Sequence, residues 1–126
     1  MDLTDNDLRG HLPTLLGELT QLRSKLILKE NSLTGSIPTE LGRASTLLSV
    51  LDLSTNQLSG ILPTQIGQLT SLTDDLMMAS NHIAGPLPSE LGLLVQVNSL
   101  FRLDHNSFTQ VWVGGTGQHA ARACML

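Results

Sequence analysis

The sequence predicts a repeat solenoid, a fold in which short turns of chain stack on one another along one axis. The first observation is a 25-residue period, marked by one asparagine per turn at Asn6, Asn31, Asn56, Asn81 and Asn106. The second is that leucine, glycine and proline recur in register with these asparagines. Self-similarity at a fixed period of about 20–50 residues is typical of stacked repeats, because one turn alone cannot bury its apolar side chains.

Each turn is expected to contain a short strand just before its asparagine. Pairs of large apolar residues stand two positions apart there, and a spacing of two is the period of a strand rather than of a helix. Because side chains alternate along a strand, each pair faces a core and the residue between faces the opposite side. Stacking then aligns the strands into a parallel sheet. The pairs are Leu26 and Leu28, Leu51 and Leu53, Leu76 and Met78, and Phe101 and Leu103.

The asparagine of each turn is expected to begin the bend that follows the strand. A buried amide needs partners for its donors and its acceptor, and stacked turns provide them as backbone groups of the same turn and of its neighbours. The sequence therefore predicts a structural asparagine ladder, formed by Asn6, Asn31, Asn56, Asn81 and Asn106.

The return path of each turn carries glycine and proline at fixed places. Glycine adopts positive φ readily and proline lacks an amide N–H, so both suit an irregular segment and exclude long helices. The two glycine columns and the proline column are Gly10, Gly35, Gly60 and Gly85; Gly17, Gly42, Gly67 and Gly92; and Pro13, Pro38, Pro63 and Pro88.

Composition excludes several classes of protein. The chain has 126 residues, 40% of them hydrophobic and 14% charged, so it is expected to fold as one compact unit rather than to be disordered. A formal charge of -4 with scattered lysine and arginine provides no basic stripe for nucleic acid. No apolar run reaches the roughly 20 residues of a membrane span, and no signal peptide is recognised at the N-terminus.

Side chains that could carry chemistry are scattered. Cys124 is the only cysteine, so it has no partner for an internal disulfide, and the four histidines fall in different columns of the repeat. The glycine-rich stretch Gly114 to Gly117 lacks the lysine of a phosphate-binding loop, and no nucleophile stands in a known catalytic motif. The sequence therefore predicts neither an enzyme nor a metal or other cofactor.

The repeat pattern sets the expected domain boundaries. Residues 1–109 are expected to form four full repeats and a fifth strand, since the pattern fails where Gln110 replaces glycine and Val113 replaces proline. Residues 110–126 are a non-repeat tail, in which Trp112 is expected to fold over the last turn as a partial cap. The first turn, Met1 to Leu8, is expected to be uncapped and to offer an edge for self-association with another chain.

The stretches SLTGSIPTELG and QLSGILPTQIGQLTSL, together with VLDLSTN, resemble the plant-type leucine-rich repeat, LxxLxLxxNxLxGxIPxxLGxL. The resemblance covers residues 1 to 108. It implies a right-handed superhelix with a parallel sheet on a concave face and 3-10 or irregular turns on the convex side. The family period is usually one residue shorter, so we expect a small bulge before each strand. Family members include ectodomains of receptor-like kinases and receptor-like proteins, and polygalacturonase inhibitors.

This resemblance implies that the chain binds a protein or peptide and has no catalytic activity, as a recognition module or scaffold that serves signalling or defence in a receptor-like protein. It also implies an extracellular or membrane-tethered location. Outward strand positions form ranks across the concave face, with one residue per turn. No rank is uniform, which favours a peptide over a crystalline lattice. Candidate binding residues on this face are Lys29, Asp52, Asp75, Met77, Arg102, Asp104 and His105.

Two alternatives stay open at this point. The residues that follow the four prolines form a rank of hydroxyl side chains, which an ice-binding or other surface-binding rod could use. The chain could also be a gene fragment without a function of its own. The hydroxyl rank consists of Thr14, Thr39, Thr64 and Ser89.

Overall fold

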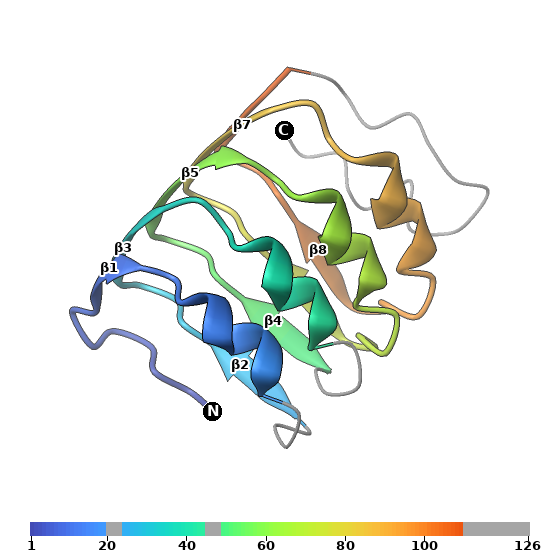
Figure 1. Cartoon of the computed structure of the whole chain (residues 1–126), viewed down its shortest axis with the longest axis horizontal. Helices are drawn as coiled ribbons and strands as arrows, with labels where there is room; N and C mark the ends of the chain where they lie inside the picture. Colours follow the sequence, from blue (N-terminus) through green and yellow to red (C-terminus); the bar gives the residue numbers. More distant parts are fainter. Residues whose placement is uncertain (20–23, 45–48, 110–126) are drawn as a thin grey trace.

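The computed structural model describes residues 1–19, 24–44 and 49–109, and these form two parallel sheets and a row of 3-10 helices (Figure 1). The first sheet has the order β2-β4-β6-β8. Its strands are β2 (Lys25–Ile27), β4 (Val50–Asp52), β6 (Asp75–Met77) and β8 (Leu100–Arg102).

The first sheet confirms the strands predicted before the asparagines. Its register pairs each residue with the residue one period on, so that Lys25 lies beside Val50, Val50 beside Asp75 and Asp75 beside Leu100. An isolated bridge between Asp2 and Ile27 continues the same register into the first turn. The repeat of the sequence is therefore also the repeat of the structure.

The bulge that the sequence predicts before each strand is present before β4 and β6, whereas before β8 the Leu100 amide donates to Asp75 Oδ1 instead. The amides of Ser49 and Val50 both donate to the carbonyl oxygen of Ser24, at 2.6 and 3.4 Å. One turn later the amides of Asp74 and Asp75 both donate to the carbonyl oxygen of Ser49, at 2.9 and 3.2 Å. Two successive amides that share one acceptor are typical of a β-bulge.

A second parallel sheet, which the sequence analysis does not predict, lies beyond the asparagines. Its order is β1-β3-β5-β7-β9. Arg9 pairs with Ser32, 23 residues on, so successive strands are staggered by two residues relative to the 25-residue repeat. The strands are β1 (Arg9–His11), β3 (Ser32–Gly35), β5 (Gln57–Ile61), β7 (His82–Gly85) and β9 (Ser107–Phe108).

Four 3-10 helices stack side by side in chain order across the other flank of the array (Figure 1). Each begins directly after a proline with extended backbone, as at Pro63, where φ is -70°. The expected 3-10 turns are therefore present. The helices are η1 (Thr14–Glu18), η2 (Thr39–Arg43), η3 (Thr64–Gln68) and η4 (Ser89–Leu93).

The core is aliphatic and runs the length of the array. Leu51, Leu53, Leu58, Ile66 and Leu76 are all 0% exposed, and they come from both sheets, from the residue that follows β4 and from one 3-10 helix. Leu51 and Leu53 are one of the predicted pairs, so the inward side of the first sheet is the side that the spacing of two predicts.

The asparagine ladder is present, and its bonds join neighbouring turns. The Nδ2 group of Asn56 donates to the carbonyl oxygens of Leu28, Leu53 and Ser54, at 3.0, 3.2 and 3.2 Å. Its Oδ1 atom accepts from the amide of Leu33 at 3.0 Å. Asn31, Asn81 and Asn106 repeat this arrangement. No buried side-chain nitrogen or oxygen of the described residues lacks a partner.

The residue before each asparagine adopts the left-handed conformation. It is not glycine in any turn, with φ of 55° at Thr55 and 57° at Ser80. Left-handed backbone costs roughly 1–2 kcal/mol for an ordinary residue, and asparagine tolerates it better than a β-branched residue does. The same φ recurs at Asp5, Glu30 and His105.

Thr55→Asn is therefore expected to stabilise the protein by about 0.5–1 kcal/mol, because it relieves this backbone strain. Urea unfolding measures the change, with Thr64→Asn in helix η3 as the control that should bring no gain. An equal effect of the two substitutions would show that strain at Thr55 is not the cause.

The boundary between an array of residues 1–109 and a tail stays a prediction. The expectations for the tail, residues 110–126, and for Trp112 as a partial cap concern residues outside the described ranges.

Candidate binding surface

We call the outward side of the first sheet the strand face. It consists of the side chains of β2, β4, β6 and β8 that point away from the core, together with the residues that follow each strand. The strand face contains Lys25, Ile27, Lys29, Val50, Asp52, Ser54, Asp75, Met77, Ala79, Leu100, Arg102, Asp104 and His105.

Asp52 lies on the strand face but is only 3% exposed. Its Oδ1 atom accepts bonds from the amide and the hydroxyl of Ser54, at 2.9 and 2.5 Å. Asp2 binds the amide and hydroxyl of Thr4 in the same way, and these bonds hold the pKa of Asp2 below its usual value. The Asp52 carboxylate therefore fixes the end of its own strand, and little of it is available to a partner.

Arg102, Asp104 and His105 form one cluster at the end of β8. The Arg102 guanidinium donates from Nε to Asp104 Oδ1 at 3.0 Å and from Nη2 to Oδ2 at 2.8 Å, a bidentate ion pair. His105 Nδ1 lies 2.8 Å from Asp104 Oδ2. The Asp104 carboxylate is 6% exposed, whereas the side chains of Arg102 and His105 face solvent. A partner would meet the Arg102 guanidinium and the His105 imidazole, with the carboxylate behind them.

The ion pair makes stability depend on pH in a predictable direction. The Arg102 guanidinium, and secondarily His105, hold the pKa of Asp104 below its usual value. The folded protein therefore binds fewer protons than the unfolded chain at acidic pH, so this contribution is present at neutral pH. It is lost as the pH falls from about 4, the pKa of an aspartate in the unfolded chain, through the lowered pKa of Asp104 in the folded protein.

Asp104→Asn is expected to destabilise the protein by about 1 kcal/mol at pH 7, the size of a partly exposed ion pair. The difference from wild type should shrink below pH 4, where the wild-type carboxylate also becomes neutral. Urea unfolding of both proteins between pH 3 and 7 checks this (about one pH unit per step suffices). A difference that stays constant across the range contradicts the assignment.

The other predicted residues lie in different settings. Lys29 Nζ contacts Glu30 Oε1 at 2.8 Å, and this bond raises the pKa of the lysine, with a smaller effect from the charge of Asp52. Asp75 is half-buried, and its Oδ1 atom accepts from the amide of Leu100 at 2.9 Å. Met77 is half-buried.

The structure thus brings the predicted residues together in two groups. Met77 on β6 pairs in register with Arg102, beside Asp104 and His105, whereas Lys29 lies toward β2. The sequence analysis did not select Leu100, which is 47% exposed at the start of β8. The sequence could have indicated that Leu100 is exposed, because it shares a rank with the exposed Lys25. Leu100 is the only large apolar side chain of that rank that is exposed.

The predicted hydroxyl rank lies at the first residue of each 3-10 helix, and all four side chains are exposed. Three of the hydroxyls bond to the next side chain. Thr39 donates to Glu40 Oε2 at 3.1 Å, Thr64 to Gln65 Oε1 at 3.3 Å, and Ser89 to Glu90 Oε2 at 3.2 Å. These hydroxyls already have acceptors within the protein.

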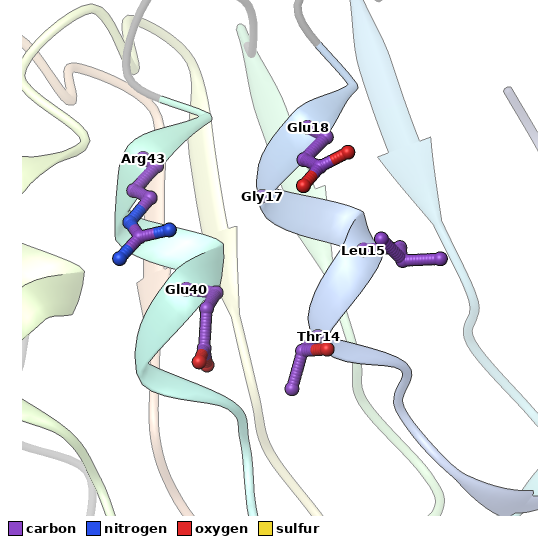
Figure 2. Close-up of a pocket in the computed structure, with 6 residues that line it drawn as sticks. All are labelled: Thr14, Leu15, Gly17, Glu18, Glu40 and Arg43. Atoms are coloured by element: carbon purple, nitrogen blue, oxygen red, sulfur yellow. The ribbon is translucent and has the colours of Figure 1, made fainter.

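A pocket of about 180 Å³ lies between η1 and η2 (Figure 2). Gly17, which lines it, lets the backbone of η2 approach closely, so that an added Cβ would overlap the carbonyl oxygen of Glu40. Its polar side chains carry mixed charge and are exposed or half-buried. It is therefore a shallow surface depression between neighbouring turns rather than a preformed ligand site. The lining residues are Thr14, Leu15, Gly17, Glu18, Glu40 and Arg43.

Among the described residues, no group of three histidine, cysteine, aspartate or glutamate side chains is placed to hold a metal ion. The helices of the same part of the chain include none with the length and hydrophobicity to cross a bilayer.

Comparisons with known proteins point in one direction. A family model described as Leucine Rich Repeat matches residues 47–69. The chain is 36% identical to the ectodomain of the Arabidopsis thaliana receptor kinase GASSHO1/SCHENGEN3, solved in complex with CASPARIAN STRIP INTEGRITY FACTOR 2. That match has a TM-score of 0.81 and covers 86% of this chain and 13% of the receptor chain. No curated protein matches the chain significantly.

Two further solved structures are similar over most of this chain. The plant peptide hormone receptor RGFR1 in complex with RGF2 has 38% identity and a TM-score of 0.72, covering 79% of this chain and 15% of the receptor. A plant ice-binding protein has 33% identity and a TM-score of 0.71, covering 80% of this chain and 32% of that one. This chain therefore spans a minor part of each of these relatives.

Proposed function

Because this chain belongs to the plant-type leucine-rich repeat family, we propose that it is a recognition module without catalytic activity that binds a peptide or protein on its strand face. The observation that carries the proposal is the in-register strand face itself. Its four strands lie at equal intervals, and the two outer strands present exposed, non-identical side chains, Lys25 on β2 and Leu100 and Arg102 on β8.

The chemistry of this face suits an extended peptide better than a repetitive surface. A peptide that crosses the strands meets Lys25 on β2, then Met77 on β6, and then Leu100 and Arg102 on β8. These offer a cation, two apolar contacts and a second cation. The similar receptor ectodomains were solved with named ligands, which supports a peptide or protein as the partner.

A selection from a random-sequence displayed peptide library tests the proposal directly. Selected peptides should bind the wild-type chain and lose at least about tenfold in affinity, or 1.4 kcal/mol, for the double variant Met77→Glu, Leu100→Glu. The variant adds two carboxylates to the strand face and leaves the core pairs unchanged. Thr64→Glu on η3 is the matched control, and it should retain the wild-type affinity.

Three outcomes would contradict the proposal. The library could yield no peptide with measurable affinity, or the selected peptides could bind the strand-face variant as tightly as wild type. Loss of binding to the Thr64→Glu control alone would place recognition on the 3-10 helices. Circular dichroism and thermal melting of each variant keep a folding defect from being counted as a loss of binding.

Ice or surface binding is the second candidate function. The similar plant ice-binding protein and the exposed rank of Thr14, Thr39, Thr64 and Ser89 favour it. Three of these hydroxyls donate to neighbouring side chains, which weighs against ice binding. Their orientation is set by these bonds within the protein and not by an ice lattice. An ice-recrystallisation assay with wild type and the Thr39→Tyr, Thr64→Tyr double variant separates the two functions.

We also propose that the chain is part of a larger receptor-like protein and that copies of it associate through the first turn. Met1 is 45% exposed in that turn, and Leu3 and Leu8 are only half-buried. Sedimentation of the chain over a range of concentrations tests self-association, and Leu8→Asp should abolish it if this edge is the contact.

A further inference from the structure

Asp75 places a negative charge on the strand face that none of the described cations neutralises. The strand-face cations Lys29 and Arg102 are bound to other carboxylates. The Oδ1 atom of Asp75 accepts from the Leu100 amide at 2.9 Å. Its Oδ2 atom has no partner in the part of the chain that the structure describes, so one carboxylate oxygen is left for a ligand.

The neighbours of Asp75 on the strand face are apolar. In register it lies between Val50 on β4 and Leu100 on β8, and Met77 stands two residues further along β6. Leu76 is 0% exposed, so the alternation of the strand places Asp75 and Met77 together on the outward side. Leu100 is exposed and Met77 is half-buried, so both have surface left to contact a ligand.

A lysine or arginine side chain has the two parts that this arrangement requires. Its aliphatic stem covers apolar surface, while its charged end binds a polar partner. A stem that lies on Met77 and Leu100 places the charged end beside Asp75, whose Oδ2 atom can accept a charge-assisted hydrogen bond. Apolar walls also lower the local dielectric constant, which strengthens the attraction between the two charges.

A second charge in the same rank sets where on the face a basic residue can bind. Lys25 is exposed on β2, two strands away from Asp75. Two strand spacings amount to about 10 Å, whereas the Debye length at physiological ionic strength is about 8 Å. The two charges therefore act as separate sites, and a basic residue is repelled at β2 and attracted at β6.

We propose that Asp75 determines which peptides the strand face binds, by pairing with a lysine or arginine whose stem packs on Met77 and Leu100. This inference rests on the proposed function and adds the class of ligand to it. The ligand is an extended peptide with a basic residue opposite β6, and Lys25 keeps that residue away from β2.

Parallel selections from one random-sequence displayed peptide library test this inference. Peptides selected on the wild-type chain should be enriched in lysine or arginine at one position. They should lose at least about tenfold in affinity for Asp75→Asn. Asparagine keeps an oxygen that can accept from the Leu100 amide, so this variant removes only the charge. Peptides selected on Asp75→Lys should carry aspartate or glutamate at that position instead.

Glu90→Gln is the matched control for the loss of charge. Glu90 is a half-buried carboxylate like Asp75, but it lies on η4, on the other flank of the array. This variant should keep the wild-type affinity. Equal losses for Asp75→Asn and Glu90→Gln would overturn the proposal, because they would show that the net charge of the protein attracts the peptides.

A change in the peptide separates this inference from the proposed function. Replacing its basic residue by methionine should weaken binding to wild type and leave binding to Asp75→Asn unchanged. Peptides that lose affinity for the Met77→Glu, Leu100→Glu variant but bind Asp75→Asn as tightly as wild type would overturn this inference alone. A library that yields no binding peptide would overturn both. Circular dichroism of each variant keeps a folding defect from being counted as a loss of binding.

Discussion

Gly67→Ala is expected to destabilise the protein by about 3 kcal/mol, a large effect for the addition of one methyl group. An added Cβ would overlap the carbonyl oxygen of Glu90, and it would lie only 2.7 Å from both the carbonyl carbon and the Cβ atom of that residue. Backbone cannot rotate away as a side chain can, so η3 and η4 would have to separate. Urea or thermal unfolding measures the loss.

The chain contains its own control for this substitution. Gly92 occupies the same position in η4, but no described segment packs against it. An added Cβ there would meet nothing within 4 Å. Gly92→Ala should therefore change stability by no more than about 0.5 kcal/mol. Equal losses for Gly67→Ala and Gly92→Ala would show that the stacking of 3-10 helices does not explain the glycine column.

Asn56→Leu is expected to cost about 4 kcal/mol. The change leaves the carbonyl oxygens of Leu28, Leu53 and Ser54 and the amide of Leu33 without their side-chain partner. Each buried group left unpaired costs roughly 1–3 kcal/mol, and the larger apolar side chain recovers part of this. Chemical unfolding with fluorescence or circular dichroism detection measures the difference.

Asn6→Leu is the matched control, because Asn6 is exposed and its Nδ2 group donates to the carbonyl oxygen of Thr4. The same chemical change at this end of the ladder should cost about 1 kcal/mol or less. If Asn56→Leu proved no more costly than Asn6→Leu, the bonds between turns would not be the source of the stability.

The columns of the repeat could be predicted from the sequence because one physical demand produces each of them. Leu51 and Leu53 alternate as only an inward-facing strand pair does, and Asn56 stands where the stack needs donors and acceptors. The second sheet could not be predicted in the same way. Its strands contain at most one buried apolar residue each, as at Leu33 and Leu58, and include glycines at positive φ such as Gly35.

The candidate site was predictable in position but not in exposure. The ranks gave the correct face for Asp52 and Asp104, yet both carboxylates are buried. The spacing Asp52 to Ser54, repeated at Asp2 and Thr4, is a signal for an aspartate that binds the backbone two residues on. Asp104 shares its column with Ser54 and Ala79, which are buried as well, so its burial belongs to that position of the repeat, and Arg102 and His105 supply its partners.

The most direct test of recognition on the strand face is a map of amide chemical shifts in the labelled chain during titration with a library-selected peptide. If the strand face binds the peptide, the largest changes fall at Lys25, Met77, Leu100 and Arg102, and Thr39 and Thr64 stay unchanged. Changes concentrated on Thr39 and Thr64, with the strand face unaffected, would contradict it.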